Sequence, residues 1–276
     1  MLTDYAALTN AQIRGYLERL GICPGEGELP EPDLVFLNRL VEAHQKNIPF
    51  ENIDVYRGKL PILLEVSDLY NKIVINRRGG YCFELNGLFV CLLRTLGYDA
   101  WSCGCRIMRG NQEIHPVLHR GNVIRLEDGL YFCDVGFGGP MPAHAVLLES
   151  GKHQSIGQEE YWPVEEEHGW WSLVRMKRGQ QDDYVPEASE GACVELMFQT
   201  SLMEPADFIP LNYFVSEPAD SFFRLKMMVN LRTDTGYRDI SDMIFTVKEN
   251  GRVTRRELTG EEERREVLAQ YFGISL

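Results

Sequence analysis

The stretch RRGGYCFELNGLF, residues 77–89, places a cysteine between two glycines and an apolar segment. Apolar side chains then recur at the spacing of one helix face, at Leu85, Leu88, Phe89, Leu92, Leu93 and Leu96. Gly97 follows as a typical residue for ending a helix. We therefore predict a buried helix of about four turns that begins near Cys82.

Cys82 has two possible roles at this position. The free N–H groups and the positive end of the helix dipole stabilise a thiolate at a helix N-terminus. Gly79 and Gly80 allow a tight turn and the close approach of a substrate, and free N–H groups can stabilise a developing oxyanion. Free cysteine is also among the most buried residue types. This segment alone leaves nucleophile and core thiol equally open.

The composition is ordinary for a soluble globular protein. The 276 residues are 44% hydrophobic and 25% charged, and the net charge of −13 argues against a nucleic-acid or anionic-membrane partner. The seven cysteines are an odd number without the spacing of a disulfide framework. The N-terminal residues lack the basic and apolar regions of a secretory signal, and no apolar run is as long as a membrane span. We expect a reduced, cytoplasmic protein.

The hydrophobic pattern changes from helical to extended along the chain, which predicts an α+β protein. Residues 33–44 carry a second helical stripe, and 261–271 a closing helix whose acidic start we expect to be solvated. Asp128-Gly129 is a hairpin turn sequence. A polar stretch at 178–183 predicts a loop. The predicted strands are 100–103, 122–126, 130–135, 170–176 and 243–247.

A cysteine nucleophile requires a base, and the base requires a group that orients it. His44 lies in the predicted early helix, where a structural role is favoured. Three other histidines, His144, His153 and His168, fall in predicted loops or polar stretches. His115 and His119 remain as candidates.

Asp134 lies in the apolar run YFCDVGF and is therefore expected to be buried with a partner. That partner is either a structural cation or an imidazole whose tautomer the carboxylate fixes. A two-residue turn at Asp128-Gly129 would place Asp134 opposite residue 123. The hairpin register therefore does not decide between His115 and His119.

Four motifs in order make the chain resemble the arylamine N-acetyltransferase family. The family's R-G-G-x-C-x-E-x-N motif is matched by RGGYCFELN at 78–86, and its I-P-F-E-N-x-D motif by IPFENID at 48–54. DVGFG at 134–138 matches a third motif, and NYFVSEP at 212–218, with Ser221 and Phe222, resembles the fourth. The resemblance extends from about residue 10 to the C-terminus.

The resemblance implies a Cys-His-Asp triad in which the histidine precedes the aspartate by fifteen residues. This spacing selects His119 over His115, with Cys82 as nucleophile and Asp134 as the orienting acid. Substrate and CoA contacts are expected from five residues, namely His115, Leu118, Phe137, Gly138 and Tyr213. Leu118 departs from the threonine usual in the family, which removes a hydroxyl beside the acyl pocket.

The fold that the resemblance implies is a helical bundle, a central β-barrel and a C-terminal α/β lid on a core like that of cysteine proteases and transglutaminases. The corresponding domains are expected at 1–97, 98–203 and 204–276. Glu51, Arg78, Glu84 and Asn86 are interpreted mainly as structural, with Arg78 paired to a carboxylate. Cys103 and Cys105 are interpreted as strand core or edge residues, because Cys-x-Cys lacks zinc-site spacing. No metal is expected.

The implied reaction is acetyl transfer from acetyl-CoA to an arylamine or arylhydrazine by a ping-pong mechanism through acetyl-cysteine. Two alternatives use the same triad. One is an amide synthase of the same fold that takes its acyl chain from a carrier protein, and the other is a thiol hydrolase or transglutaminase-like enzyme. A non-catalytic binding module is disfavoured because it does not explain a thiol, an imidazole and a carboxylate together. We expect a monomer or a weak homo-oligomer.

Overall fold

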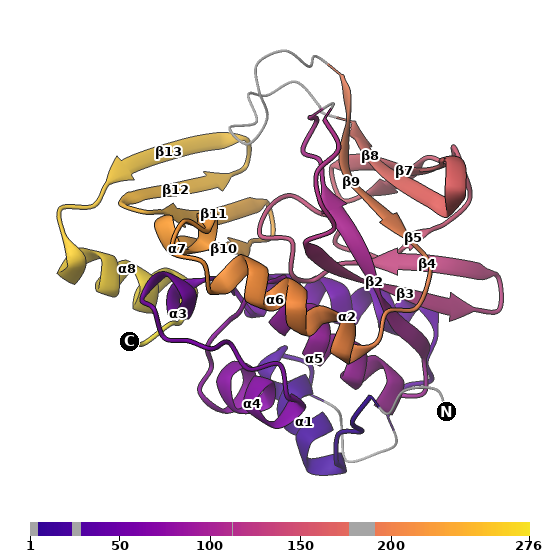
Figure 1. Cartoon of the computed structure of the whole chain (residues 1–276), viewed down its shortest axis with the longest axis horizontal. Coiled ribbons are helices and arrows are strands. Elements are labelled where there is room, and N and C mark those ends of the chain that lie inside the picture. Colours follow the sequence, from indigo (N-terminus) through magenta and orange to yellow (C-terminus); the bar gives the residue numbers. More distant parts are fainter. Residues whose placement is uncertain (1–4, 24–28, 112, 177–190) are drawn as a thin grey trace.

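The computed structural model describes residues 5–23, 29–111, 113–176 and 191–276. The fold is α+β, as predicted: helices gather on one side of the molecule, and two antiparallel sheets occupy the rest (Figure 1). The predicted loop at 178–183 lies outside the described residues. Among the described helices, none is long and apolar enough to span a membrane.

The helix that begins at Cys82 is the centre of the helical part. It runs from Cys82 to Thr95, and its residues 82–93 are all buried, so it is covered on every side rather than on one stripe. The predicted helix at 33–44 extends to Asn47, and the Asp33 carboxylate caps its start by accepting a hydrogen bond from the Phe36 N–H. The helices are α1 (Asn10–Arg19), α2 (Leu34–Asn47), α3 (Ile53–Tyr56), α4 (Val66–Tyr70), α5 (Cys82–Thr95), α6 (Phe208–Ser216), α7 (Phe222–Leu225) and α8 (Glu261–Phe272).

The larger sheet has eight strands in the order β5-β4-β3-β2-β9-β8-β7-β6. Its strand β5 also contacts β7, so the sheet curls toward a barrel. Strands β2 and β3 pack against α5, so this sheet lies beside the helix that begins at Cys82. The strands are β2 (Asp99–Ile107), β3 (His119–Leu126), β4 (Gly129–Cys133), β5 (Val146–Leu147), β6 (Gln154–Ile156), β7 (Glu159–Glu165), β8 (Trp170–Met176) and β9 (Ala192–Gln199).

The smaller sheet joins the C-terminal part of the chain to the helical part. Its order is β1-β10-β11-β12-β13, and the edge strand β1 comes from the segment just before α3. Phe50 of β1 pairs with Asn230 of β10. The strands are β1 (Phe50–Glu51), β10 (Met228–Arg232), β11 (Gly236–Ser241), β12 (Ile244–Glu249) and β13 (Arg252–Glu257).

The register predicted for the hairpin that precedes Asp134 is wrong. Leu126 pairs with Gly129, so the turn consists of residues 127 and 128 rather than Asp128 and Gly129. The ladder ends at the pair Asn122–Cys133, and Asp134 therefore lies beyond the last strand residue. Because the chain leaves the sheet there, Asp134 does not have to face the residue that the hairpin register would place opposite it.

The acidic start of α8 is only partly solvated as predicted. Glu261 and Glu262 are exposed, but Arg264 is buried and pairs with Glu261. Glu263 accepts hydrogen bonds from the backbone and hydroxyl of Thr259. These contacts lower the pKa of Glu263 to about 2, first through the Thr259 bonds and then through Arg256.

Gly79, three residues before Cys82, can be tested as a position where only glycine fits. A Cβ added to it would lie 1.9 Å from the carbonyl oxygen of Pro49 and 2.9 Å from the Cγ of Glu51. Because a backbone carbonyl cannot move aside cheaply, Gly79→Ala is expected to lower the free energy of unfolding by about 1–3 kcal/mol. Urea unfolding followed by fluorescence measures this change.

The matched control is Gly260→Ser. Gly260 has extended backbone and precedes α8, and an added Cβ would meet no atom within 4 Å. We expect the free energy of unfolding of this variant to lie within about 0.5 kcal/mol of that of the parent. Equal stability of Gly79→Ala and the parent would show that the turn before Cys82 is not tightly enclosed.

Candidate active site

Cys82 is the first residue of α5, where unpaired N–H groups and the helix dipole favour an anion. Its side chain is 4% exposed. The turn before it is fixed at both ends: the Glu51 N–H donates to the carbonyl of Gly80 at 2.8 Å, and the Tyr81 N–H donates to the Glu84 carboxylate at 3.1 Å. The sulfur is therefore held at a defined point on the helix end.

Buried ion pairs surround this turn. Arg78 contacts Glu51 at 2.7 Å and Asp54 at 3.2 Å, as expected for a guanidinium that needs a carboxylate. Lys72 contacts Glu84 at 2.7 Å and Asp54 at 3.0 Å. Burial lowers the pKa of Lys72, but the neighbouring carboxylates raise it by more, so the pKa lies above its ordinary value. These four contacts among five charged side chains support the structural interpretation of Glu51, Arg78 and Glu84.

His119 begins β3 and makes a short hydrogen bond to Asp134, with 2.5 Å between Nε2 and Oδ2. Both residues are 3% exposed. Burial lowers the pKa of His119, but the charges of Asp134 and Cys82 and hydrogen bonds with both raise it to about 10. Because Nε2 is used by Asp134, the other ring nitrogen is the one left to face Cys82. The structure thus brings thiol, imidazole and carboxylate together in one line of contacts.

Asn86 connects the helix to the carboxylate. Its side-chain amide donates to Asp134 Oδ1 at 2.8 Å and to the Arg120 carbonyl at 2.6 Å, and its oxygen accepts from the Val135 N–H at 3.0 Å. The Gly136 N–H also donates to Asp134 Oδ1, at 2.8 Å. Asn86, interpreted from the sequence mainly as structural, therefore orients the acid that orients the histidine.

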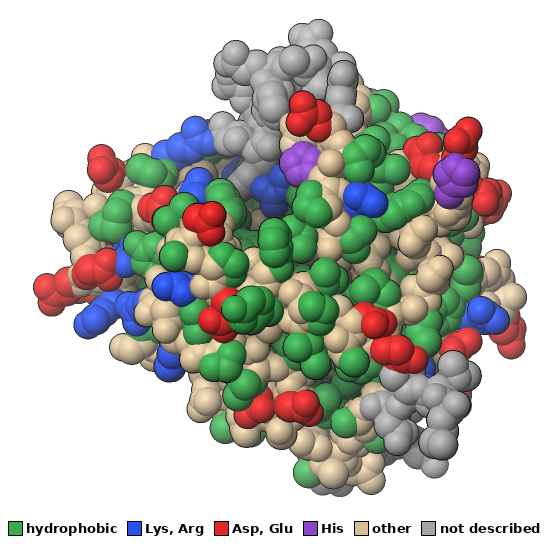
Figure 2. Space-filling view, in the orientation of Figure 1, with side chains coloured by type: hydrophobic (Ala, Val, Ile, Leu, Met, Phe, Trp, Pro, Cys, Tyr) green, Lys and Arg blue, Asp and Glu red, His purple; other side chains and the backbone are tan. Residues whose placement is uncertain are grey.

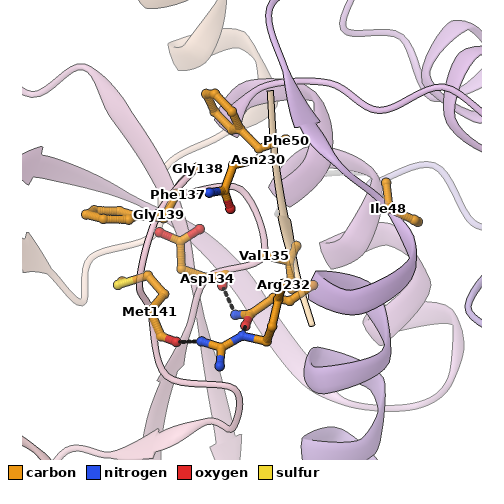
Figure 3. A pocket seen from close by; sticks show the side chains of 11 residues that line it. Ile48, Phe50, Asp134, Val135, Phe137, Gly138, Gly139, Met141, Asn230 and Arg232 are labelled. Carbon is orange, nitrogen blue, oxygen red and sulfur yellow. Dashed lines mark hydrogen bonds between the residues drawn. The ribbon is translucent and has the colours of Figure 1, made fainter. Parts of the chain in front are cut away.

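The segment after Asp134 is held by side chains from α2 and β10 (Figure 3). The Gln45 amide donates to the carbonyls of Asp134 and Pro142, both at 2.9 Å. Arg232 donates to the side-chain oxygen of Gln45 at 2.8 Å and also to the Met141 carbonyl. A hollow of about 30 Å³ lies among these groups, which is room for about one water.

A cavity of about 860 Å³ opens beside the thiol and the imidazole. Cys82 and His119 lie in its wall, as do four of the residues predicted to contact substrate, namely His115, Leu118, Phe137 and Gly138. The structure places Tyr213 elsewhere: its side chain is 64% exposed, and the next residues of α6, Phe214 and Val215, line the cavity. Helix α6 thus contributes to the wall through residues that the sequence prediction did not name.

The cavity has a mostly apolar wall with a few positive and polar groups. Arg109, His115 and Lys226 lie in it, although the chain as a whole is strongly acidic. Asn230 lies in the wall of both the cavity and the small hollow, and its Nδ2 is buried without a hydrogen-bond partner. An anionic or carbonyl-bearing ligand would find its donors here.

The apolar character continues outside the cavity. Side chains of α6 and α7, among them Ile209, Tyr213, Phe222 and Leu225, are exposed, and hydrophobic side chains gather over the centre of the face where α6 runs (Figure 2). The cavity is therefore bordered by apolar surface on the side of α6.

The other cysteines and histidines lie as the sequence indicated. Cys103 and Cys105 are free, buried core residues of β2, with sulfurs 4.0 Å apart. His44 is buried in α2 with its Nε2 2.9 Å from the Tyr16 hydroxyl, and burial lowers its pKa to about 3. His153 and His168 are exposed. The described residues contain no group of three side chains that could hold a metal ion.

Several site residues could not be found from the sequence. Gln45 and Arg232 act over long sequence separations and belong to no motif, so no pattern points to them. Asn230 lies in the short strand β10, and nothing in the sequence around it indicates that it lines a cavity. Only Asn86, inside the cysteine motif, carried a recognisable signal.

Comparisons with known proteins identify the family of the chain. Residues 33–276 match the family model described as N-acetyltransferase. The arylamine N-acetyltransferase of Mycolicibacterium smegmatis is 30% identical over 272 residues, which cover 95% of this chain and 91% of that protein.

Two solved structures are similar over nearly the whole chain. The arylamine N-acetyltransferase of Salmonella typhimurium has a TM-score of 0.84 and 27% identity, covering 97% of this chain and 92% of that one. The Mycobacterium marinum enzyme in complex with CoA has a TM-score of 0.82 and 27% identity, covering 95% and 92%. With this match of sequence and fold, the chain belongs to the arylamine N-acetyltransferase family.

Proposed function

We propose that the chain transfers an acetyl group from acetyl-CoA to an aromatic amine or hydrazine through an acetyl-Cys82 intermediate. The observation that carries this proposal is the line of contacts Cys82–His119–Asp134, which ends at a cavity of about 860 Å³. The similarity to a relative in complex with CoA supports CoA as one of the ligands.

In the first half-reaction, the Cys82 thiolate attacks the carbonyl carbon of the acetyl thioester. The bond between that carbon and the CoA sulfur breaks, and the protonated His119 gives its proton to the departing sulfur. The acyl group passes between two sulfurs of similar energy, so neither direction is strongly favoured. Asp134 keeps the imidazole in place while its charge changes.

In the second half-reaction, the amine nitrogen attacks the acetyl carbon of acetyl-Cys82. The carbon–sulfur bond breaks, Cys82 leaves as a thiolate, and His119 accepts the proton from nitrogen. The thiolate and the imidazolium are thereby regenerated. Aromatic amines and hydrazines suit this step because their nitrogen is unprotonated at neutral pH.

The cavity wall supports the proposed pair of substrates. Phe137, Phe214 and Leu118 offer apolar contact for an aromatic ring. Arg109 and Lys226 offer positive charge for the phosphates of a CoA molecule. Leu118 in place of a hydroxyl-bearing residue makes the surroundings of the acetyl group more apolar. The cytoplasmic location and the monomeric or weakly oligomeric state stay predictions, and a role in xenobiotic metabolism is what the family resemblance implies.

The covalent step can be tested by mixing the protein with acetyl-CoA in the absence of amine. We expect one acetyl group per chain, found by intact-mass and peptide mass spectrometry on Cys82. Addition of an arylamine should remove it at the rate of the overall reaction. Cys82→Ala should take up no acetyl group and lose about 10⁴-fold or more of the activity while it still folds.

Three outcomes would count against the proposal. Acetyl transfer by Cys82→Ala would exclude the covalent route. Release of acetate at a rate independent of added amine would indicate a thiol hydrolase. No acetylation by acetyl-CoA, with acylation by a carrier-bound acyl chain, would indicate the amide synthase alternative.

The role of Asp134 predicts a change in the titration of His119. Burial alone lowers the pKa of this imidazole, and Asp134 is the strongest influence that raises it. In Asp134→Asn the imidazolium should therefore lose its proton at lower pH than in the parent, where the pKa is about 10. NMR of ¹⁵N-labelled histidine measures the midpoint directly.

Activity should follow the titration. Asp134→Asn is expected to lower kcat by about 10²- to 10⁴-fold at neutral pH, since the imidazole loses its orientation and its charged form. His153→Asn, at an exposed position outside the cavity, is the control and should leave both kcat and the His119 midpoint unchanged. An unchanged His119 midpoint in Asp134→Asn would contradict the assigned role.

A further inference from the structure

A ring of hydrogen bonds joins four buried polar residues: Arg120 and Asn122 of β3, Ser102 of β2 and Asn86 of α5. The Nε of Arg120 donates to the Ser102 hydroxyl at 2.9 Å, and this hydroxyl donates to Oδ1 of Asn122 at 3.0 Å. The Asn122 amide donates to Oδ1 of Asn86 at 3.1 Å, and the Asn86 amide donates to the Arg120 carbonyl at 2.6 Å. The ring therefore closes on the residue where it begins.

The direction of these hydrogen bonds follows from what each group can donate. A guanidinium has no acceptor, so the Ser102 oxygen has to accept from Arg120 and gives its one proton to Asn122. The side-chain oxygen of Asn122 therefore faces Ser102, and its NH₂ group faces Asn86. The two ends of the Asn122 amide are thus not interchangeable.

The same reasoning fixes the side chain of Asn86. Its oxygen accepts from the Asn122 amide and from the Val135 N–H, at 3.0 Å, and both of these groups are donors. Its NH₂ group faces two acceptors, the Arg120 carbonyl and Oδ1 of Asp134, the latter at 2.8 Å. If the amide turned over, its oxygen would face the Asp134 carboxylate and its NH₂ group would face two donors. Asn122 is thus one of two groups that keep the NH₂ of Asn86 directed at Asp134.

Asp134 depends on this amide because it lies outside the strand ladder. β4 ends one residue before it, and the last ladder pair of the hairpin includes Asn122. Its Oδ1 accepts from Asn86 and from the Gly136 N–H, and its Oδ2 makes the short hydrogen bond to His119. A rotation of the carboxylate would therefore be passed on to the imidazole.

Stability alone does not explain why this part of the sheet is polar. Replacing both partners of a buried hydrogen bond by apolar groups of the same shape costs little. The next pair on the same face of β2 and β3, Ala100 and Ile124, is apolar and fully buried. A fully satisfied polar network, in contrast, holds its members in one arrangement.

We propose that Asn122 is a positioning residue for the triad: it holds the Asn86 amide in the orientation that anchors Asp134, and thereby keeps His119 directed at Cys82. Ser102 sets the direction of Asn122 in turn. This inference rests on the proposed function, in which His119 moves protons to and from the reacting groups.

The test is the rate at which acetyl-CoA acetylates Cys82 of the full-length chain without amine, followed by rapid quenching and intact-mass spectrometry. Asn122→Leu keeps the shape of the side chain and removes its polar groups. The rate constant at saturating acetyl-CoA is expected to fall by about 10- to 10²-fold. The acetyl-CoA concentration that gives half of this rate should stay near the parent value, because Asn122 lies outside the cavity wall.

The titration of His119 gives a second readout that a purely structural role would not move. A loosened Asp134 carboxylate stabilises the imidazolium less, so in Asn122→Leu the midpoint should move to lower pH. The shift should have the direction of that in Asp134→Asn and be smaller. NMR of ¹⁵N-labelled histidine measures it.

A double-mutant cycle shows whether Asn122 acts through Asn86. Asn86→Ala removes the amide that reaches Asp134 and should slow acetylation by itself. Adding Asn122→Leu to Asn86→Ala should then slow it no further, whereas two independent effects would multiply.

Val123→Ala is the matched control. Val123 is the neighbour of Asn122 in β3 but packs on the other side of the strand, in the core cluster that contains Phe132. This variant should lower stability and leave both the acetylation rate and the His119 midpoint unchanged.

Ser102→Ala serves if Asn122→Leu does not fold. It removes the hydroxyl that sets the direction of Asn122 and leaves the asparagine in place. Acetylation should be slower than in the parent and faster than in Asn86→Ala, and the His119 midpoint should again move to lower pH.

Either an unchanged acetylation rate or an unchanged His119 midpoint in folded Asn122→Leu, or in Ser102→Ala if that is the variant that folds, would overturn the inference. Multiplying effects in the double variant, or an equal slowing in Val123→Ala, would do the same. Failure of the proposed function is a separate result, seen when the parent itself takes up no acetyl group. The His119 midpoint still tests the inference in that case, because it needs no catalysis.

Discussion

The short hydrogen bond between His119 and Asp134 is the contact on which the rest of the site depends. It forms because β4 ends one residue before Asp134, which lets the chain turn back toward the start of β3. Asn86 then ties the carboxylate to α5, and Gln45 and Arg232 hold the segment that follows it. A helix, a hairpin end and a second sheet must therefore all be in place before the imidazole can face Cys82. The mostly apolar cavity completes the arrangement by opening beside a thiol that is itself almost buried.

The start of α5 gathers an unusual amount of buried charge. On one side, Arg78 and Lys72 are each paired with carboxylates, and these pairs hold the turn that presents the thiol. On the other side, the buried guanidinium of Arg120 donates to the Ser102 hydroxyl and to the Phe83 carbonyl. Buried charges cost stability unless they are balanced. The pairs of Arg78 and Lys72 therefore fix the turn from which α5 and Cys82 begin.

Much of the fold could be predicted from local sequence, and much of the site could not. The spacing from Leu85 to Leu96 and the glycines before Cys82 predicted α5 and its start, because a helix pattern is local. The choice of His119 over His115 came from the family resemblance. The hairpin register could not make it, because the predicted turn was one residue too late and Asp134 lies beyond the last paired residue of β4. Phe214 lines the cavity where Tyr213 was expected, since one residue along a helix changes the face by about 100°. The roles of Gln45 and Arg232 depend on contacts between distant segments, which no local pattern contains.

The central claim is that Cys82 is a thiolate paired with an imidazolium before any substrate binds. The most direct measurement is the ultraviolet difference spectrum near 240 nm between the parent and Cys82→Ala, recorded from acidic to alkaline pH, because a thiolate absorbs there and a thiol does not. The account predicts the absorbance of one thiolate already present at about pH 6. Appearance of that absorbance only near pH 8.5, the range of an ordinary free cysteine, would contradict it.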